Sequence, residues 1–122
     1  MNHTVLYIDD SDDNLVLVER ILRRRGDVRL RVARTGREGI EAAVGDPPGL
    51  ILLDNRLPDS SGLQVLRELA VSPATAAVPV VMLSGDSEQA MVKELLAAGA
   101  SDFLAKPFAV GDLLALIARY LG

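Results

Sequence analysis

The sequence contains no cysteine and few aromatic residues, and both facts limit what the chain can be. Without cysteine, it can form neither a disulfide framework nor a thiolate metal site. Aromatic residues make up only 3% of the 122 residues, so the core must be built from leucine, valine, isoleucine and alanine. Apolar residues reach 49% in total, which is enough for a core in a chain of this length.

Long hydrophobic runs are also missing. The longest apolar segments are far shorter than the roughly 20 residues that a membrane helix needs. The stretch Met1-Asn2-His3-Thr4 leads straight into a strand-like segment, so we expect no secretory signal. These features favour a cytoplasmic protein that contacts no membrane, and the length fits one domain over residues 1–122.

Positive charge is in the minority, with 13 Lys and Arg against 17 Asp and Glu, and the formal net charge is −4. This balance argues against direct binding to nucleic acid, which requires an excess of positive charge. The run Arg23-Arg24-Arg25 is the one local exception. We interpret it as a solvated helix end, where cations complement the helix dipole.

Short apolar segments alternate with longer amphipathic ones along the whole chain. The expected strands are 5–8, 28–33, 50–53, 78–83 and 101–105. The expected helices are 12–25, 35–44, 62–70, 87–98 and 109–121. Such alternation indicates a parallel sheet with helices on both faces and right-handed crossovers. We therefore predict an α/β, flavodoxin-like (βα)5 three-layer sandwich with strand order 2-1-3-4-5.

Polar residues follow four of the expected strands directly. They are Asp9 and Asp10 after the first strand, Asp54 after the third, Ser84 after the fourth and Lys106 after the fifth. In the predicted order these four strands are neighbours, and open parallel sheets bind ligands at the carboxyl ends of their strands. We therefore expect these side chains to converge at one edge of the sheet.

Three carboxylates in one crevice repel one another, and a divalent cation removes that cost. Oxygen ligands suit Mg²⁺, which typically binds one or two carboxylates and shares oxygens with phosphate. A carboxylate beside Mg²⁺ can attack an activated phosphorus and form an aspartyl phosphate. The transition state spreads charge over three oxygens, which an ammonium such as Lys106 and a hydroxyl such as Ser84 can meet.

Four segments of the chain resemble the response-regulator receiver family of two-component signalling. They are VLYIDDS, LILLDNRLPDSSG, VVMLSGDS and AGASDFLAKPF, in this order and over the whole chain. The resemblance implies a phosphorelay switch rather than an enzyme with an external substrate. A sensor histidine kinase or a histidine phosphotransfer protein would donate the phosphoryl group, with Mg²⁺ or Mn²⁺ as cofactor. Self-catalysed phosphorylation and dephosphorylation would be its only chemistry.

The resemblance implies a role for each matching residue of the acidic cluster. Asp54 would be the phosphoacceptor and also a metal ligand. Asp10 would be a direct metal ligand, whereas Asp9 would act mainly through metal-bound water. The backbone carbonyl of Arg56 would complete the metal site. Arg56 and Asp86 flank the site at positions that influence the phosphate lifetime in the family, and we expect them to do so here.

The remaining roles concern phosphoryl binding and switching. Ser84 and Lys106 would bind the incoming phosphoryl oxygens. Phe103 would be the aromatic residue whose rotamer follows Ser84, although the family more often has tyrosine at its position. The Lys106–Pro107 peptide bond would be cis, a geometry nearly confined to bonds before proline.

The output surface would be formed by the last two helices and the fifth strand, which would contact a downstream domain or protein. In the final helix we expect an inward-facing set: Val110, Leu113, Leu114, Ile117 and Leu121. Leu116 and Tyr120 would then lie nearer the opposite side. An apolar stripe there would suit a partner or a homodimer, and scattered exposed apolar residues are an equal alternative.

Three other functions fit parts of the sequence. A phosphohydrolase with an aspartyl-phosphate intermediate needs a second acid two residues after its nucleophile, where this chain has Arg56. An FMN-binding electron carrier needs a phosphate-binding loop after the first strand, where this chain is acidic. A receiver that signals by binding alone usually has a damaged acidic pair or phosphoacceptor, and here both are intact.

Each candidate also has a purely structural interpretation. Asp9 and Asp10 could stabilise a helix start, and Phe103 could be a core residue. We expect Asp59 and Asn14 to be capping and loop polar groups.

Overall fold

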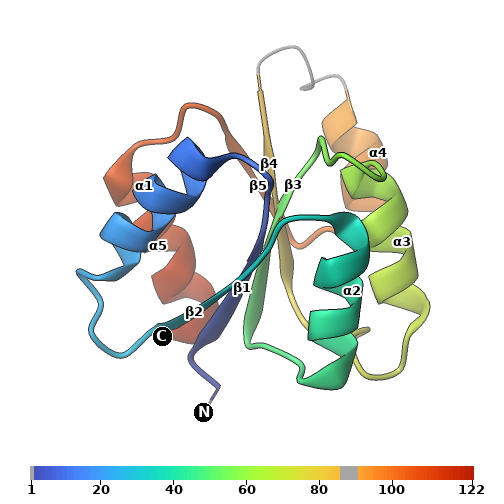
Figure 1. Cartoon of the computed structure of the whole chain (residues 1–122), viewed down its shortest axis with the longest axis horizontal. Coiled ribbons are helices and arrows are strands. Elements are labelled where there is room, and N and C mark those ends of the chain that lie inside the picture. Colours follow the sequence, from blue (N-terminus) through green and yellow to red (C-terminus); the bar gives the residue numbers. More distant parts are fainter. Residues whose placement is uncertain (1, 86–90) are drawn as a thin grey trace.

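The structure, a computed structural model, describes residues 2–85 and 91–122 (Figure 1). Its strands form one sheet in the order β2-β1-β3-β4-β5, with every neighbouring pair parallel. The strands are β1 (Thr4–Ile8), β2 (Arg29–Ala33), β3 (Leu50–Asp54), β4 (Val80–Ser84) and β5 (Asp102–Ala105). The predicted flavodoxin-like order is confirmed.

Helices cover both faces of this sheet (Figure 1). On one face lie α1 (Asp12–Leu22) and α5 (Val110–Leu121), and on the other lie α2 (Gly36–Gly45), α3 (Gly62–Val71) and α4 (Val92–Ala97). No helix within the described residues is long and apolar enough to cross a membrane.

The core consists of two apolar clusters, one on each side of the sheet. Tyr7 and Leu52 belong to the cluster under α1 and α5, whereas Ile8 and Leu53 belong to the cluster under α2 and α3. Because successive side chains of a strand point to opposite faces, a strand that feeds both clusters must be apolar throughout. This explains the continuous apolar runs of the central strands.

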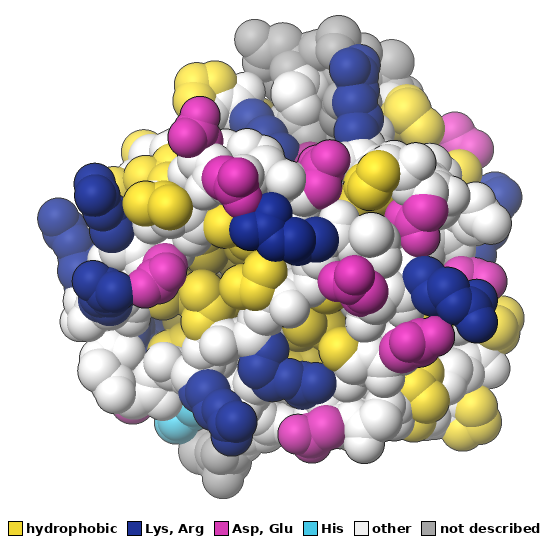
Figure 2. All heavy atoms as spheres, in the orientation of Figure 1, with side chains coloured by type: hydrophobic (Ala, Val, Ile, Leu, Met, Phe, Trp, Pro, Cys, Tyr) yellow, Lys and Arg dark blue, Asp and Glu magenta, His cyan; other side chains and the backbone are white. Residues whose placement is uncertain are grey.

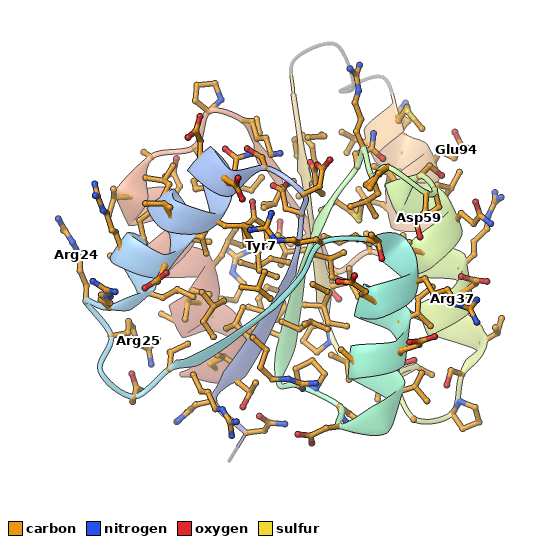
Figure 3. The ribbon with its side chains drawn as sticks, viewed as in Figure 1. Tyr7, Arg24, Arg25, Arg37, Asp59 and Glu94 are labelled. Atoms are coloured by element: carbon orange, nitrogen blue, oxygen red, sulfur yellow. The ribbon has the colours of Figure 1, made fainter. Side chains whose placement is uncertain are left out.

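The structure moves several expected boundaries. The first helix ends at Leu22 rather than Arg25, and Arg23 is its C-cap. The basic run therefore lies at and just beyond the helix end, and Figure 3 shows Arg24 reaching outward. The fourth helix begins at Val92 within the described residues, and the expected start at residue 87 lies outside them.

The expected position of Leu116 on the outer side of α5 was wrong. Leu116 is only 8% exposed and packs in the same cluster as Leu113 and Ile117. The reason is that α1 packs beside α5, so a second side of α5 is covered as well as the side that faces the sheet. Tyr120 is half-buried and donates its hydroxyl to the Ser101 carbonyl at 3.1 Å. Of the two alternatives for the outer side of this helix, the apolar stripe is therefore not present.

Candidate functional site

The expected site residues meet at the carboxyl end of the sheet. Asp9 follows β1, Asp54 ends β3, and Lys106 follows β5. The ends of β4 and β5 are joined through the backbone, since the amide of Lys106 donates to the Ser84 carbonyl at 2.7 Å. One carboxylate oxygen from each of Asp9, Asp10 and Asp54 lies within 4.8 Å of the others. The predicted convergence is therefore present.

Lys106 is the cation of this cluster. Its Nζ lies 2.6 Å from Oδ1 of Asp54 and 3.5 Å from Oδ2 of Asp9. Both carboxylates are buried, and Asp9 is only 1% exposed. Two buried carboxylates this close would repel each other strongly, and the ammonium between them offsets that repulsion.

Asp9 is held by its own neighbours as well. Its Oδ2 accepts hydrogen bonds from the Tyr7 hydroxyl at 2.5 Å and from Nδ2 of Asn14 at 3.2 Å. Its Oδ1 accepts a bond from the Ser11 amide at 3.0 Å. Asp10, by contrast, is exposed at the mouth of the cluster. The two acids of the pair therefore have different surroundings.

Sequence reasoning missed Tyr7 and misjudged Asn14. We expected Asn14 to be a capping or loop group, but it lies in the first turn of α1 and contacts Asp9. Tyr7 had one available signal, because a hydroxyl two residues before Asp9 on a strand points to the same face. Burial first, and the hydrogen bond to Asp9 second, raise the pKa of Tyr7 far above its ordinary value of 10.0.

Ser84 and Phe103 lie at the same end of the sheet, but on the face opposite to that of Asp9 and Asp54. Ser84 is fully buried, and its Oγ has no hydrogen-bond partner within the described part of the chain. Buried hydroxyls normally have one, so this Oγ can donate to a ligand that enters the cluster. Phe103 pairs in register with Met82 and is half-buried against the same apolar cluster.

A glycine allows the next helix to begin against the acceptor strand. A Cβ at Gly62 would lie 2.9 Å from Cα of Asn55 and 3.0 Å from the Asp54 carbonyl oxygen. The amide of Gly62 also donates to the Asn55 carbonyl at 2.8 Å. The backbone after Asp54 is thus fixed by α3.

The other expected positions are placed as follows. The Lys106–Pro107 peptide bond is cis. Arg56 is exposed and forms an isolated bridge with Ser61. Asp86 lies outside the described residues.

The donor set suits a hard divalent cation. All three clustered acids offer carboxylate oxygens, and Lys106 balances only part of their charge. Mg²⁺ takes such ligands and keeps several waters. The exposed Asp10 leaves the cluster open to those waters, while the buried Asp9 and Asp54 supply negative charge.

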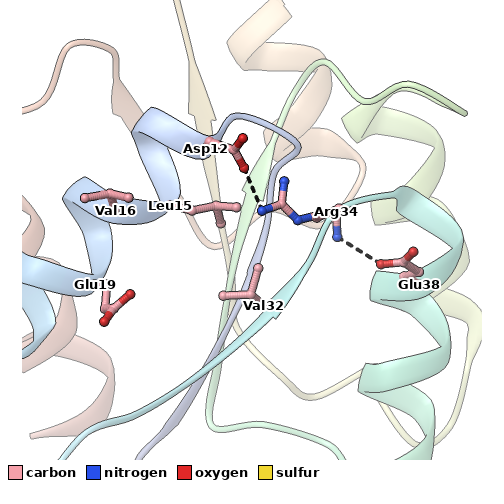
Figure 4. Close-up of a pocket in the computed structure, with 7 residues that line it drawn as sticks. All are labelled: Asp12, Leu15, Val16, Glu19, Val32, Arg34 and Glu38. Carbon is pink, nitrogen blue, oxygen red and sulfur yellow. Dashed lines mark hydrogen bonds and ion pairs between the residues drawn. The ribbon is translucent and has the colours of Figure 1, made fainter.

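A hollow between α1 and β2 is a less suitable candidate (Figure 4). Its apolar lining includes Val32, which is 47% exposed. The charged groups at its rim already have partners, because Arg34 contacts Asp12 at 2.6 Å and its amide donates to Glu38. Among the described residues that line this hollow, no group of polar side chains points toward one common ligand position. Figure 2 shows acidic and basic side chains interspersed over this face of the molecule.

Comparison with known proteins identifies the family. The family model of the response regulator receiver domain matches residues 5–118. The chain belongs to this family. It is 30% identical to the chemotaxis protein CheY of Bacillus subtilis (strain 168) over 121 residues, which cover 99% of both chains.

Two further relatives show the range of the receiver family. The chain is 39% identical to the KDP operon transcriptional regulatory protein KdpE of Escherichia coli (strain K12) over 114 residues. That match covers 91% of this chain but 48% of KdpE, so the chain spans about half of that relative. The receiver domain of sensor histidine kinase PA1611 from Pseudomonas aeruginosa PAO1 has a magnesium ion coordinated in its active site cleft. It superposes with a TM-score of 0.88 and 28% identity over 98% of both chains.

Receiver domains are signalling modules of two-component systems, and they interact with histidine kinases and with downstream output domains. They bind Mg²⁺ in an acidic pocket. This receiver has such a pocket in the cluster of Asp9, Asp10 and Asp54. A general role as a phosphoacceptor in signalling is therefore supported.

Proposed function

We propose that Asp54 accepts a phosphoryl group from a sensor histidine kinase or a histidine phosphotransfer protein in a reaction that requires Mg²⁺ or Mn²⁺. The observation that supports this most directly is the position of the Asp54 carboxylate. It ends a fully buried strand, faces Lys106 at 2.6 Å and shares its crevice with two further acids. Asp54 is the last residue of β3, and its Oδ1 lies nearer to Nζ of Lys106, at 2.6 Å, than Oδ2 of Asp9 does, at 3.5 Å.

In the proposed reaction, an oxygen of Asp54 attacks the phosphorus of the donor phosphohistidine. The new bond joins that oxygen to phosphorus, the phosphorus–nitrogen bond breaks, and the imidazole nitrogen keeps the electron pair. The ammonium of Lys106 balances charge on the phosphoryl oxygens. Asp10, Asp54 and the backbone carbonyl of Arg56 would hold the metal, with Asp9 nearby, and the metal would supply further positive charge.

The switch that we propose begins at Ser84. The Oγ of Ser84 has no hydrogen-bond partner within the described residues. It can therefore donate a hydrogen bond to a phosphoryl oxygen on Asp54. Ser84 pairs in register with Ala105, and Phe103 lies two residues earlier on the same face of β5. A shift of Ser84 toward Asp54 therefore opens space that Phe103 can enter. This rotation would change the surface formed by α4, β5 and α5.

Three further roles are proposed for the residues around the site and for the chain as a whole. Arg56 is exposed beside the acceptor, and we propose that it modulates the phosphate lifetime together with Asp86. The KdpE relative is about twice as long as this chain, so we propose that the α4, β5 and α5 surface signals to a further domain or protein. We also propose a cytoplasmic location, by analogy with the transcriptional regulators among the relatives.

Intact mass measurement tests the acceptor. The chain is incubated with a small acyl-phosphate donor, with Mg²⁺ or with a chelator. We expect one phosphoryl adduct that requires Mg²⁺, disappears in Asp54→Asn and persists in Asp59→Asn. Asp59 is a matched control because its carboxylate lies five residues away and bonds the amides of α2 instead.

The alternatives give different results. An adduct that persists in Asp54→Asn contradicts the proposed acceptor, and an adduct that forms without metal contradicts the proposed cofactor. If the small donor gives no adduct, a phosphorylated histidine kinase replaces it. No transfer from either donor would leave a receiver that signals by binding alone.

A further inference from the structure

Tyr7 is a buried polar residue for which the proposed phosphoryl transfer has no role. It is the last residue but one of β1, is fully buried, and packs in the apolar cluster between the sheet and the α1–α5 layer. Figure 3 shows it at the centre of the molecule. A buried tyrosine hydroxyl usually finds a partner, and here that partner is Asp9, an acid of the candidate metal cluster.

The bond goes to the oxygen of Asp9 that faces the cluster. Oδ2 is the atom that lies 3.5 Å from Nζ of Lys106, and Lys106 in turn contacts Asp54. Both Tyr7 and Asn14 donate to this same Oδ2, whereas the Ser11 amide donates to Oδ1. A carboxylate oxygen has about two lone-pair sites. Oδ2 therefore already uses its accepting capacity within the protein, whereas within the described residues Oδ1 accepts only the Ser11 amide.

We propose that Tyr7, supported by Asn14, is a positioning residue that prevents Oδ2, the oxygen of Asp9 on the Lys106 side, from binding the metal directly and so determines which metal the site prefers. This inference rests on the proposed function. With Oδ2 occupied, Asp9 acts on the ion through its charge and through metal-bound water. Direct protein ligands are then few, and the ion must keep several waters. That condition favours Mg²⁺ over Ca²⁺, which prefers six to eight oxygen ligands and accepts irregular geometry.

The geometry explains why Tyr7 can do this without entering the crevice. Tyr7 and Asp9 are two residues apart on one strand, so both point to the α1–α5 side of the sheet. Leu52 is the register partner of Tyr7, and Asp54 follows it by two residues on that same side. The tyrosine ring thus lies one layer below the carboxylates, and its hydroxyl reaches Asp9 from beneath while the mouth stays open for an ion.

The test is metal binding to the whole chain, measured by titration calorimetry with Mg²⁺ alone and with Ca²⁺ alone, and without any phosphoryl donor. Tyr7→Phe keeps the ring and removes only the hydroxyl. We expect Mg²⁺ binding to weaken by about tenfold, the lower end of the range for outer residues that orient a metal site, because a loosened Asp9 no longer holds the metal-bound water in the octahedral geometry that Mg²⁺ requires. Ca²⁺ binding should not weaken, because the freed Oδ2 becomes available as an additional ligand. The preference for Mg²⁺ over Ca²⁺ therefore falls by about tenfold.

Tyr120→Phe is the matched control. It removes the other tyrosine hydroxyl of the chain, which donates to the Ser101 carbonyl and to Asp102 beside α5. We expect it to leave both dissociation constants unchanged. Asn14→Ala removes the second donor to Oδ2 and should shift the preference in the same direction as Tyr7→Phe. It keeps the inference testable if Tyr7→Phe does not fold.

Urea unfolding in chelator separates positioning from structure. A purely structural role for Tyr7 would lower the unfolding midpoint and weaken both ions equally, and that result overturns the inference. Dissociation constants for Mg²⁺ and Ca²⁺ that stay unchanged in both Tyr7→Phe and Asn14→Ala overturn the inference as well. If the wild-type chain binds neither ion, the inference fails through its premise, and the phosphorylation assay on Asp54 reports separately whether the proposed function survives.

Discussion

At the scale of single residues, Lys106 connects the chemistry of the site to the stability of the fold. It is one of only two lysines in the chain. Its ammonium contacts Asp54 at 2.6 Å and lies 3.5 Å from Asp9, and its side chain is 22% exposed. Removing one partner of such an ion pair leaves carboxylates that are buried and poorly compensated. The stability of the metal-free protein should therefore depend on Lys106.

We expect Lys106→Met to lower the free energy of unfolding in chelator by about 1–3 kcal/mol, the cost of leaving a buried polar group without its partner. Added Mg²⁺ should reduce this loss, because a cation in the acidic cluster replaces the missing charge. Urea unfolding with chelator and with Mg²⁺ measures both effects. Lys93→Met is the control, since Lys93 is the other lysine and is exposed on α4. A loss of equal size with and without metal would contradict this account.

At the scale of secondary structure, the start of α2 is held from two directions. Thr35 is the N-cap, and its hydroxyl accepts a bond from the Glu38 amide at 3.0 Å. The carboxylate of Asp59, from the loop after β3, accepts bonds from the amides of Gly36 at 2.8 Å and Arg37 at 3.0 Å. The labelled side chains of Arg37 and Asp59 lie on the same side of the molecule in Figure 3. The acceptor loop and α2 are thereby joined.

The bond from Asp59 should make the stability of α2 depend on pH. The amides of Gly36 and Arg37 hold the pKa of Asp59 below its ordinary value of 3.8. A carboxyl group with a lowered pKa in the folded state stabilises the fold above its unfolded pKa, and this contribution is lost as the pH falls through the folded value. We expect Asp59→Ala to destabilise the protein at neutral pH and to cost progressively less as the pH falls below 3.8.

Thr35→Ala is the control for this measurement. It removes the other cap of the same helix end but does not titrate, so its cost of about 1 kcal/mol should not change with pH. Urea unfolding of both variants at a series of pH values compares them. If the loss of unfolding free energy in Asp59→Ala were as independent of pH as the loss in Thr35→Ala, the amide bonds to Asp59 would not be what makes the stability of α2 depend on pH.

At the scale of the whole molecule, the exposed apolar side chains of the described residues do not form one extended face. The large ones lie on five different elements and are Val16, Leu17, Val32, Val44, Val71 and Leu96. Figure 2 shows apolar and charged side chains interspersed on one face of the molecule. Scattered apolar residues are normal on a monomer surface, and the apolar stripe considered for α5 is absent because Leu116 is buried.

We therefore expect the unphosphorylated chain to be a monomer. Sedimentation velocity over a dilution series should give one sedimentation coefficient that does not change with concentration. A coefficient that rises with concentration would show self-association and would restore the homodimer as a partner. The same series after phosphorylation of Asp54 then shows whether the switched surface differs.

The sequence by itself determined the fold and which charged side chains meet at the edge of the sheet, because both follow from local pattern. Apolar strands that alternate with amphipathic helices specify a parallel sheet, and polar residues directly after strands lie at its carboxyl edge. For this reason the convergence of Asp9, Asp10, Asp54 and Lys106 follows from the order of residues along the chain. The capping residue Thr35 could be predicted for the same reason, since its partner is three residues away.

The tertiary structure decided what depends on residues that are distant in the sequence. Leu116 is buried because α1, about 100 residues earlier, packs beside α5. Asp59 caps α2 because two loops more than 20 residues apart meet. Asn14 contacts Asp9 because α1 begins directly above the strand end. The direction in which a polar side chain turns depends on which donors and acceptors surround it, and those surroundings exist only once the layers have packed.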